Sequence, residues 1–294
     1  MGSDNQRDVD MSEHVMACID ASGYAMAVCD YAAWASQRLE APLTFLHVLD
    51  NHLPPDEGNL SGNIGLGSRE HLLEELATLD ERRAKLAQEQ SRVMLEAARG
   101  RAVEDGIAEP HTRQRNGELV ETLSELESEM RLLVLGKRGE SAHLASEHIG
   151  SKLERVVRAM HRPILMVPDT FRTPKRVMIA FDGSKTTRKG IEMIAESPLF
   201  KGIGCHVVMI GADDSSLRTQ CDWALDTLNN AGIEAHGAIR TGEVEAALHI
   251  YQHEHDIDLL VMGAYGHTRI RHLLVGSITT AMLRSADIPL LLLR

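Results

Sequence analysis

The chain has 294 residues, of which 43% are hydrophobic and 25% charged, so it is long enough for two ordinary domains and too apolar for a disordered chain. Acidic residues outnumber Lys and Arg by 43 to 31, and the formal net charge of −12 repels nucleic acid and anionic lipid. Aromatic residues make up only 3%, which leaves few rings on which bases could stack. We therefore expect no nucleic-acid partner.

The same composition bears on where the protein works. No run of residues approaches the roughly 18–20 consecutive apolar residues of a membrane-spanning helix, so we expect no membrane span. Residues 1–11 form a polar tail without the apolar core of a signal peptide. The four cysteines include no C-x-x-C pair, which fits a reducing compartment. These features together favour a cytoplasmic protein.

The first half of the chain is interrupted by an insertion. An apolar strand at 43–49 is followed by residues 50–68, which hold two Pro and four Gly and are predicted to be a loop. Residues 69–99 then repeat apolar side chains at helical spacing, which predicts one long helix. We expect this stripe to pack on the sheet of its own domain, with a partner-binding surface as the alternative; it consists of Leu72, Leu76, Leu79, Leu86, Val93 and Ala97.

The two halves of the chain repeat each other. VMACIDAS (15–22) matches VMIAFDGS (177–184), and GELVETL (117–123) matches GEVEAAL (242–248). Further along, LLVLGKRG (132–139) matches LLVMGAYG (259–266), and RPILMVP (162–168) matches IPLLLLR (288–294). Four matches in the same order indicate a duplication. We place the domains at 12–168, with the insertion at 50–99, and at 174–294.

Strands and helices alternate clearly in the second half. The predicted strands span 176–181, 205–211, 234–240, 258–263 and 288–293, and the predicted helices span 185–197, 215–231, 243–255 and 276–286. Strands that are apolar throughout and alternate with helices indicate a parallel sheet covered on both faces. With right-handed crossovers, each half becomes a doubly wound α/β domain.

Two features of each repeat fall where open parallel sheets bind ligands, beyond the carboxyl ends of the strands. The first is the Asp after strand one, Asp20 or Asp182. The second is the loop after strand four, which in the second half begins with Gly263 and Gly266 and reaches Gly276-Ser277 after nine residues. Glycines let backbone amides approach an anion, and a helix starting at Gly276-Ser277 offers unpaired N–H groups. The sequence therefore predicts a phosphate site.

The pattern G-x2-G-x9-G-S, after a strand that ends in A-x-D-G-S, resembles the universal stress protein family, here in tandem. The resemblance implies five-stranded domains of strand order 3-2-1-4-5 that hold ATP or AMP, with or without Mg. Carried over by position, Asp182 would contact the adenosine part and Ile210 would lie near adenine. Ribose and phosphates would be held by Gly263, Gly266, Gly276 and Ser277.

The first half departs from this pattern, because ten residues separate Gly139 from Gly150. Lys137 and Arg138 favour phosphate in this loop, but Glu140 and Glu147 offset their charge. Whether the first half binds nucleotide stays open at this point. The residues at matching positions are Asp20, Val48, Gly136, Gly139, Gly150 and Ser151.

Each of these signals also has a purely structural interpretation. A Gly after a strand can be a tight turn, Gly-Ser can be a helix cap, and Asp182 can cap the following helix. His249 and His253 are four apart on one helix, a metal-binding spacing, but a solvated helix face is the simpler interpretation. The sequence contains no evident catalytic triad or cysteine nucleophile.

We therefore expect a regulatory protein of the stress response that binds adenine nucleotide and an unidentified protein partner, with at most slow ATP hydrolysis. The alternatives are a scaffold that does not bind nucleotide and a weak ATPase or nucleotidyl-transferase-like enzyme.

The last strand of each half is apolar throughout but would lie at a sheet edge, where bare strands aggregate. The residues are ILMVP (164–168) and PLLLLR (289–294). We expect these strands to pair with each other about a pseudo-two-fold axis within one chain. A homodimer of the tandem chain through the long helix is a further hypothesis.

Overall fold

The computed structural model of the chain describes residues 13–49, 66–139, 151–263 and 277–294, without the side chains of 66–73, 151 and 277. The first half contains β1 (His14–Cys18), α1 (Ala25–Leu39), β2 (Leu43–Leu49), α2 (Leu66–Glu104), β3 (His111–Asn116), α3 (Leu119–Leu126), the 3-10 helix η1 (Glu127–Glu129), β4 (Met130–Gly136), α4 (Ser151–Ala159) and β5 (Ile164–Val167). The second half contains β6 (Arg176–Ala180), α5 (Lys185–Glu196), the 3-10 helix η3 (Pro198–Phe200), β7 (Gly204–Ile210), α6 (Ser215–Asn230), β8 (Ala235–Arg240), α7 (Val244–Glu254), β9 (Leu259–Gly263), α8 (Ser277–Ser285) and β10 (Leu290–Leu293).

All ten strands form one sheet, in the order β3-β2-β1-β4-β5-β10-β9-β6-β7-β8. Within each half the strands are parallel in the order 3-2-1-4-5, so the predicted fold class is confirmed. The halves meet at β5 and β10, which pair antiparallel with Leu291 opposite Leu165. Because these are equivalent strands of the two repeats, antiparallel pairing relates the halves by an approximate two-fold, and the predicted edge-to-edge pairing is confirmed.

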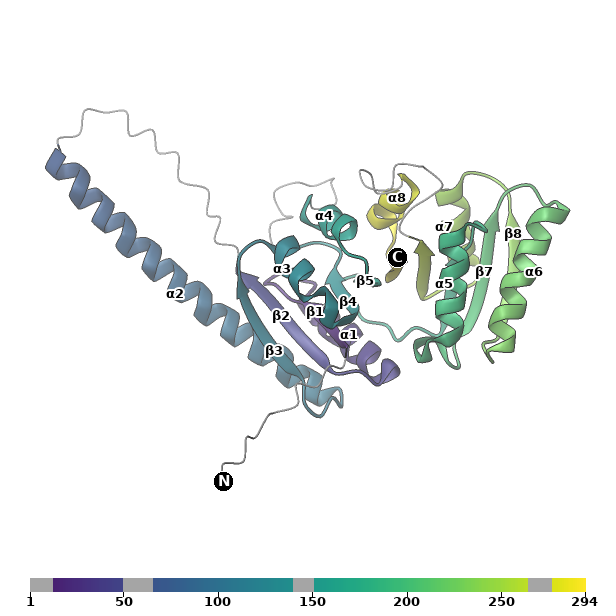
Figure 1. The fold of residues 1–294 in the computed structure, drawn as a ribbon, viewed down its shortest axis with the longest axis horizontal. Helices are drawn as coiled ribbons and strands as arrows, with labels where there is room; N and C mark the ends of the chain where they lie inside the picture. Colours follow the sequence, from purple (N-terminus) through teal and green to yellow (C-terminus); the bar gives the residue numbers. More distant parts are fainter. Residues whose placement is uncertain (1–12, 50–65, 140–150, 264–276) are drawn as a thin grey trace, which may run out of the picture.

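Helices cover both faces of the sheet (Figure 1). One apolar core contains residues of α1, the C-terminal part of α2, α5 and α6, and the other contains residues of α3, α4, α7 and α8. In β4, Leu132 and Val134 belong to the first core, whereas Leu133 and Leu135 belong to the second. A strand buried on both faces needs apolar residues at successive positions, which explains the continuous apolar runs.

The repeated Gly-Glu pair has a structural role in starting helices. Gly117 and Gly242 have φ values of 136° and 119°, a conformation that favours glycine. Glu118 then accepts hydrogen bonds from the N–H groups of Val120 and Glu121 at the start of α3. Glu243 likewise accepts from Ala246 at the start of α7. The pair is thus a turn followed by an N-cap.

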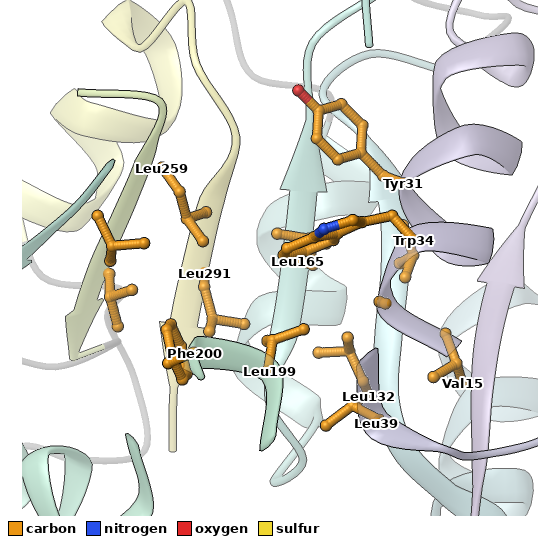
Figure 2. Close-up of a cluster of buried hydrophobic side chains, with 14 of the residues drawn as sticks. Val15, Tyr31, Trp34, Leu39, Leu132, Leu165, Leu199, Phe200, Leu259 and Leu291 are labelled. Atoms are coloured by element: carbon orange, nitrogen blue, oxygen red, sulfur yellow. The ribbon is translucent and has the colours of Figure 1, made fainter. Parts of the chain in front are cut away.

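Buried side chains cross the boundary between the halves (Figure 2). Leu199 and Phe200 of η3 lie beneath β5 and β10, in one core with Trp34 and Leu39 of α1. Arg38 of α1 donates hydrogen bonds to the carbonyl oxygens of Leu199, at 3.1 Å, and of Lys201. The tandem repeat therefore shares one core across the boundary between its halves.

The long helix α2 is present, but the predicted packing of its apolar stripe is wrong. Leu76, Leu79, Leu86 and Val93 are between 42% and 65% exposed, and Ala97 is exposed as well. The residues that pack on the domain are instead Ser91, Leu95, Ala98 and Ala102. Only this C-terminal part of α2 contacts the sheet, and the rest of the helix extends away from it (Figure 1). Leu72 lies among the side chains that are not described.

Candidate functional site

A cavity of about 770 Å³ opens beyond the carboxyl ends of β1, β2 and β4. Four residues predicted for the first-half site line it together: Asp20, Val48, Gly136 and Gly139. The volume lies within the ~300–1,000 Å³ of typical small-ligand sites. The position, where the strand order of a parallel sheet reverses, is the usual ligand site of such folds. The described first-half residues therefore converge on one site.

The two glycines of this site have different surroundings. A Cβ on Gly139 would lie 3.1 Å from Oδ2 of Asp20, so the absence of a side chain lets this loop lie against the carboxylate. A Cβ on Gly136 would lie 2.8 Å from Cβ of Tyr24, so packing alone accounts for this glycine. Gly139 is thus the glycine that shapes the ligand side of the cavity.

The charged groups of the cavity have opposite signs. Asp20 accepts a hydrogen bond from the N–H of Ser22 at 3.0 Å, which fixes the carboxylate at the end of β1. Arg138 and Lys152 also line the cavity. Lys152, at the start of α4, was missed by the sequence analysis, although a basic residue directly after Gly-Ser is a recognisable signal.

Lys137 does not line the cavity, although its charge was expected to favour phosphate binding. Its ammonium donates a hydrogen bond to the carbonyl oxygen of Ala286 in the second half. Burial, and after it the charge of Arg138, lowers the pKa of the Lys137 ammonium below its usual range. Lys137 thus joins the two halves, and Arg138 is the cation of the pair that lines the cavity.

The insertion supplies one wall of the cavity, which the sequence analysis did not foresee. Ala87, Gln90, Ser91 and Met94 of α2 all line it. Ser91 is fully buried, and its hydroxyl lies 2.8 Å from Nδ1 of His47, the residue before Val48 in β2. No local feature of the sequence signals this wall.

Cys18 lines the same cavity but is poorly suited to nucleophilic chemistry. Burial, reinforced by the negative charge of Asp20, raises the pKa of its thiol to about 12. A thiol with this pKa stays protonated near neutral pH, whereas the thiolate is the nucleophile. Cys18 is therefore unsuited to act as a nucleophile in this cavity.

The second half places Asp182, Ile210 and Gly263 beyond or at the ends of β6, β7 and β9, which are neighbours in the sheet. Oδ1 of Asp182 accepts hydrogen bonds from the Ser184 N–H at 3.0 Å and from the Thr187 hydroxyl at 2.6 Å. The N-cap of α5 is Ser184, whose hydroxyl accepts a hydrogen bond from the Thr187 N–H at 3.3 Å, so the expected alternative, that Asp182 caps α5, is wrong. Asp182 instead holds the turn that leads into the helix.

Other predicted residues are described in part or not at all. Ser151 and Ser277 begin α4 and α8, as a helix-entrance site requires. The predicted glycines Gly150, Gly266 and Gly276 lie outside the described residues.

The sequence profile of the universal stress protein family matches residues 11–168 and 209–294. The chain belongs to this family. Universal stress protein Slr1230 of Synechocystis sp. is 35% identical over 286 residues, which cover 96% of this chain and 100% of that protein. Universal stress protein Rv2005c of Mycobacterium tuberculosis is 25% identical over 60% of this chain and 65% of its own length. A universal stress protein from Archaeoglobus fulgidus shares the fold, with a TM-score of 0.67, 16% identity and 96% of both chains covered.

The described residues form neither a metal-binding cluster nor a membrane-spanning helix. Among its described residues, this universal stress protein has no group of three or more His, Cys, Asp or Glu side chains placed to hold a metal ion. His249, considered above as a ligand, lies 2.8 Å from the hydroxyl of Ser285 through its Nε2. None of the described helices is long and apolar enough to cross a membrane.

Proposed function

We propose that this universal stress protein is a cytoplasmic regulatory protein of the stress response that binds ATP or AMP. The observation that carries the proposal is the cavity that unites Asp20, Val48 and Gly139 with the cations Arg138 and Lys152. A carboxylate accepts hydrogen bonds from ribose hydroxyls, and guanidinium and ammonium groups bind phosphates. These complementary groups suit a nucleotide better than an uncharged ligand.

The sequence favours the second half as the nucleotide site because its glycine motif is complete, whereas the described geometry favours the first. In the second half, Asp182, Ile210 and Gly263 lie in the corresponding arrangement, so we propose a second site there. Its remaining groups would be Gly266, Gly276 and Ser277. With the first-half residues Gly136, Gly150 and Ser151 at matching positions, one chain would bind two nucleotides.

Calorimetry on protein stripped of bound ligand tests the proposal. We expect heat of binding with both ATP and AMP. Arg138→Ala and Lys152→Ala should weaken ATP by about tenfold or more, the typical effect of losing one hydrogen bond to a charged group. AMP, with fewer phosphate charges, should lose less.

The matched control is Lys85→Ala. Lys85 forms an exposed ion pair with Glu81 on α2, at 2.7 Å, and does not line the cavity, so binding should not change. The absence of heat with either nucleotide at millimolar concentration would overturn the proposal. In that case, a scaffold that binds protein partners without nucleotide becomes the leading function.

A further inference from the structure

The face of α2 that points away from the domain carries apolar side chains that are largely exposed. Leu79 is 46%, Leu86 65% and Val93 54% exposed. They are seven residues apart, the spacing at which helices pair in a coiled coil. At 100° per residue they lie on roughly the opposite side of α2 from Ser91 and Leu95, which face the domain. This surface, here called the α2 stripe, cannot reach its own sheet.

The next position of the seven-residue repeat is Gly100. Contacts within the described chain do not explain why this position has no side chain. A glycine inside a helix costs about 1 kcal/mol relative to alanine. A Cβ at Gly100 would meet no atom within 4 Å, so nothing in the described chain requires a glycine here. A residue without a side chain at this position leaves room for another helix to approach.

The charges around the α2 stripe favour a second copy of this chain as the occupant. Residues 74–99 carry six acidic and five basic side chains, whereas the whole chain has a net charge of −12. This segment is therefore a surface on which two copies repel each other little. We propose that two chains associate through an antiparallel pair of α2 helices, with the α2 stripe of each chain packed against that of the other.

The antiparallel direction follows from the flanking residues. When two such stripes run in opposite directions and interdigitate, Arg82 of one copy lies beside Glu89 of the other, twice by symmetry. A parallel pair would instead place Arg83 opposite Arg83, because this residue occupies a core position of the same repeat. Opposite charges would thus flank only the antiparallel pair.

Sedimentation equilibrium on the full chain tests this proposal. The wild type should be a dimer, and the double variant Leu79→Glu, Leu86→Glu should be a monomer with unchanged circular dichroism. Val103→Glu is the matched control because Val103 is 51% exposed on α2 but outside the stripe, so this variant should remain dimeric.

Charge reversal tests the direction of pairing. Arg82→Glu should weaken association by about tenfold, since it replaces two attractive pairs by two repulsive ones. Adding Glu89→Arg should restore association, although it also removes the pair of Glu89 with Arg92. A wild type that stays monomeric up to millimolar concentration, or a dimer that is indifferent to the Leu79 and Leu86 changes, would overturn the proposal. A dimer that Arg82→Glu does not weaken would overturn the antiparallel arrangement.

Discussion

The side chain of His206 makes the stability of the folded protein depend on pH. Its Nδ1 lies 2.8 Å from the hydroxyl of Tyr251 on α7, and its ring centroid lies 5.6 Å from that of His236 and 5.3 Å from that of His255. Burial lowers the pKa of the His206 imidazole below its usual value, and the charges of His255, His236 and Arg176 lower it further. The folded protein therefore favours the neutral ring.

Linkage gives the sign of the effect. As the pH falls below about 6.5, the ordinary pKa of histidine, the unfolded chain takes up a proton that the folded chain still refuses. The free energy of unfolding should therefore decrease on acidification from neutral pH. We expect the urea midpoint of the wild type to fall in this window and that of His206→Gln to fall less.

His253→Gln is the control for this prediction, because His253 is an exposed residue of α7, the helix that carries Tyr251, and its loss should leave the pH dependence intact. The pKa values of the Glu127 and Asp287 carboxyls are lowered. Their contribution to the free energy of unfolding is therefore lost only at more acidic pH. An equal pH dependence in His206→Gln and in the wild type would contradict the prediction.

At the level of the helix, α2 divides into a packed and an exposed part, and this division can be measured. Leu95 is 5% exposed and belongs to the core beneath the first half of the sheet. Leu95→Ala should lower the free energy of unfolding by about 2–5 kcal/mol, the usual cost of such a deletion in a core. Val103→Ala, on the same helix but 51% exposed, should change it little. Urea denaturation monitored by circular dichroism distinguishes the two, and similar losses in both variants would contradict the assigned orientation.

The same helix shows what the sequence could predict and what it could not. The existence of α2 follows from periodicity, and strands such as β4 and β9 follow from apolar runs, because these patterns are local. Apolar runs could not predict β3, which has the sequence HTRQRN. The face that α2 buries is not set locally, since the small residues Ala98 and Ala102 are buried in the core, while the larger Leu86 is 65% exposed. Hydrophobicity alone therefore selected the wrong side of the helix.

In the candidate site, too, the residues set by local sequence patterns were predictable and those set by tertiary packing were not. Asp20, Val48, Gly136 and Gly139 were predictable because each ends a strand or starts the loop behind it, and parallel strands bring their ends together. Gln90 and Ser91 were not predictable, because the chain contains no local sign that an insertion bends back over the cavity. Lys137 and Arg138 are adjacent, and only the packing of the second half shows which of them faces away.

At the scale of the whole molecule, the two halves are held together by the contacts around β5 and β10. Beyond the β5–β10 pairing, Arg294 at the C-terminus donates a hydrogen bond to the carbonyl oxygen of Met160 in the first half, at 2.7 Å. The segment between the halves is also fixed, since the ring of Phe171 packs edge-on against that of Tyr31 at 4.7 Å. Neither half can unfold without exposing the other's edge strand, so we expect one cooperative unfolding transition.

The two tryptophans make this expectation testable, because each half has one. Trp34 is 8% exposed in α1, and Trp223 of α6 stacks on Phe181, with ring centroids 6.1 Å apart. Trp223→Phe leaves a fluorescence probe of the first half, and Trp34→Phe leaves a probe of the second. In each variant, the urea midpoint from fluorescence should coincide with that from circular dichroism, which averages over both halves. This comparison within one variant removes the effect of the substitution itself on stability. If fluorescence and circular dichroism gave different midpoints, the halves would unfold separately and the shared sheet would contribute little to their stability.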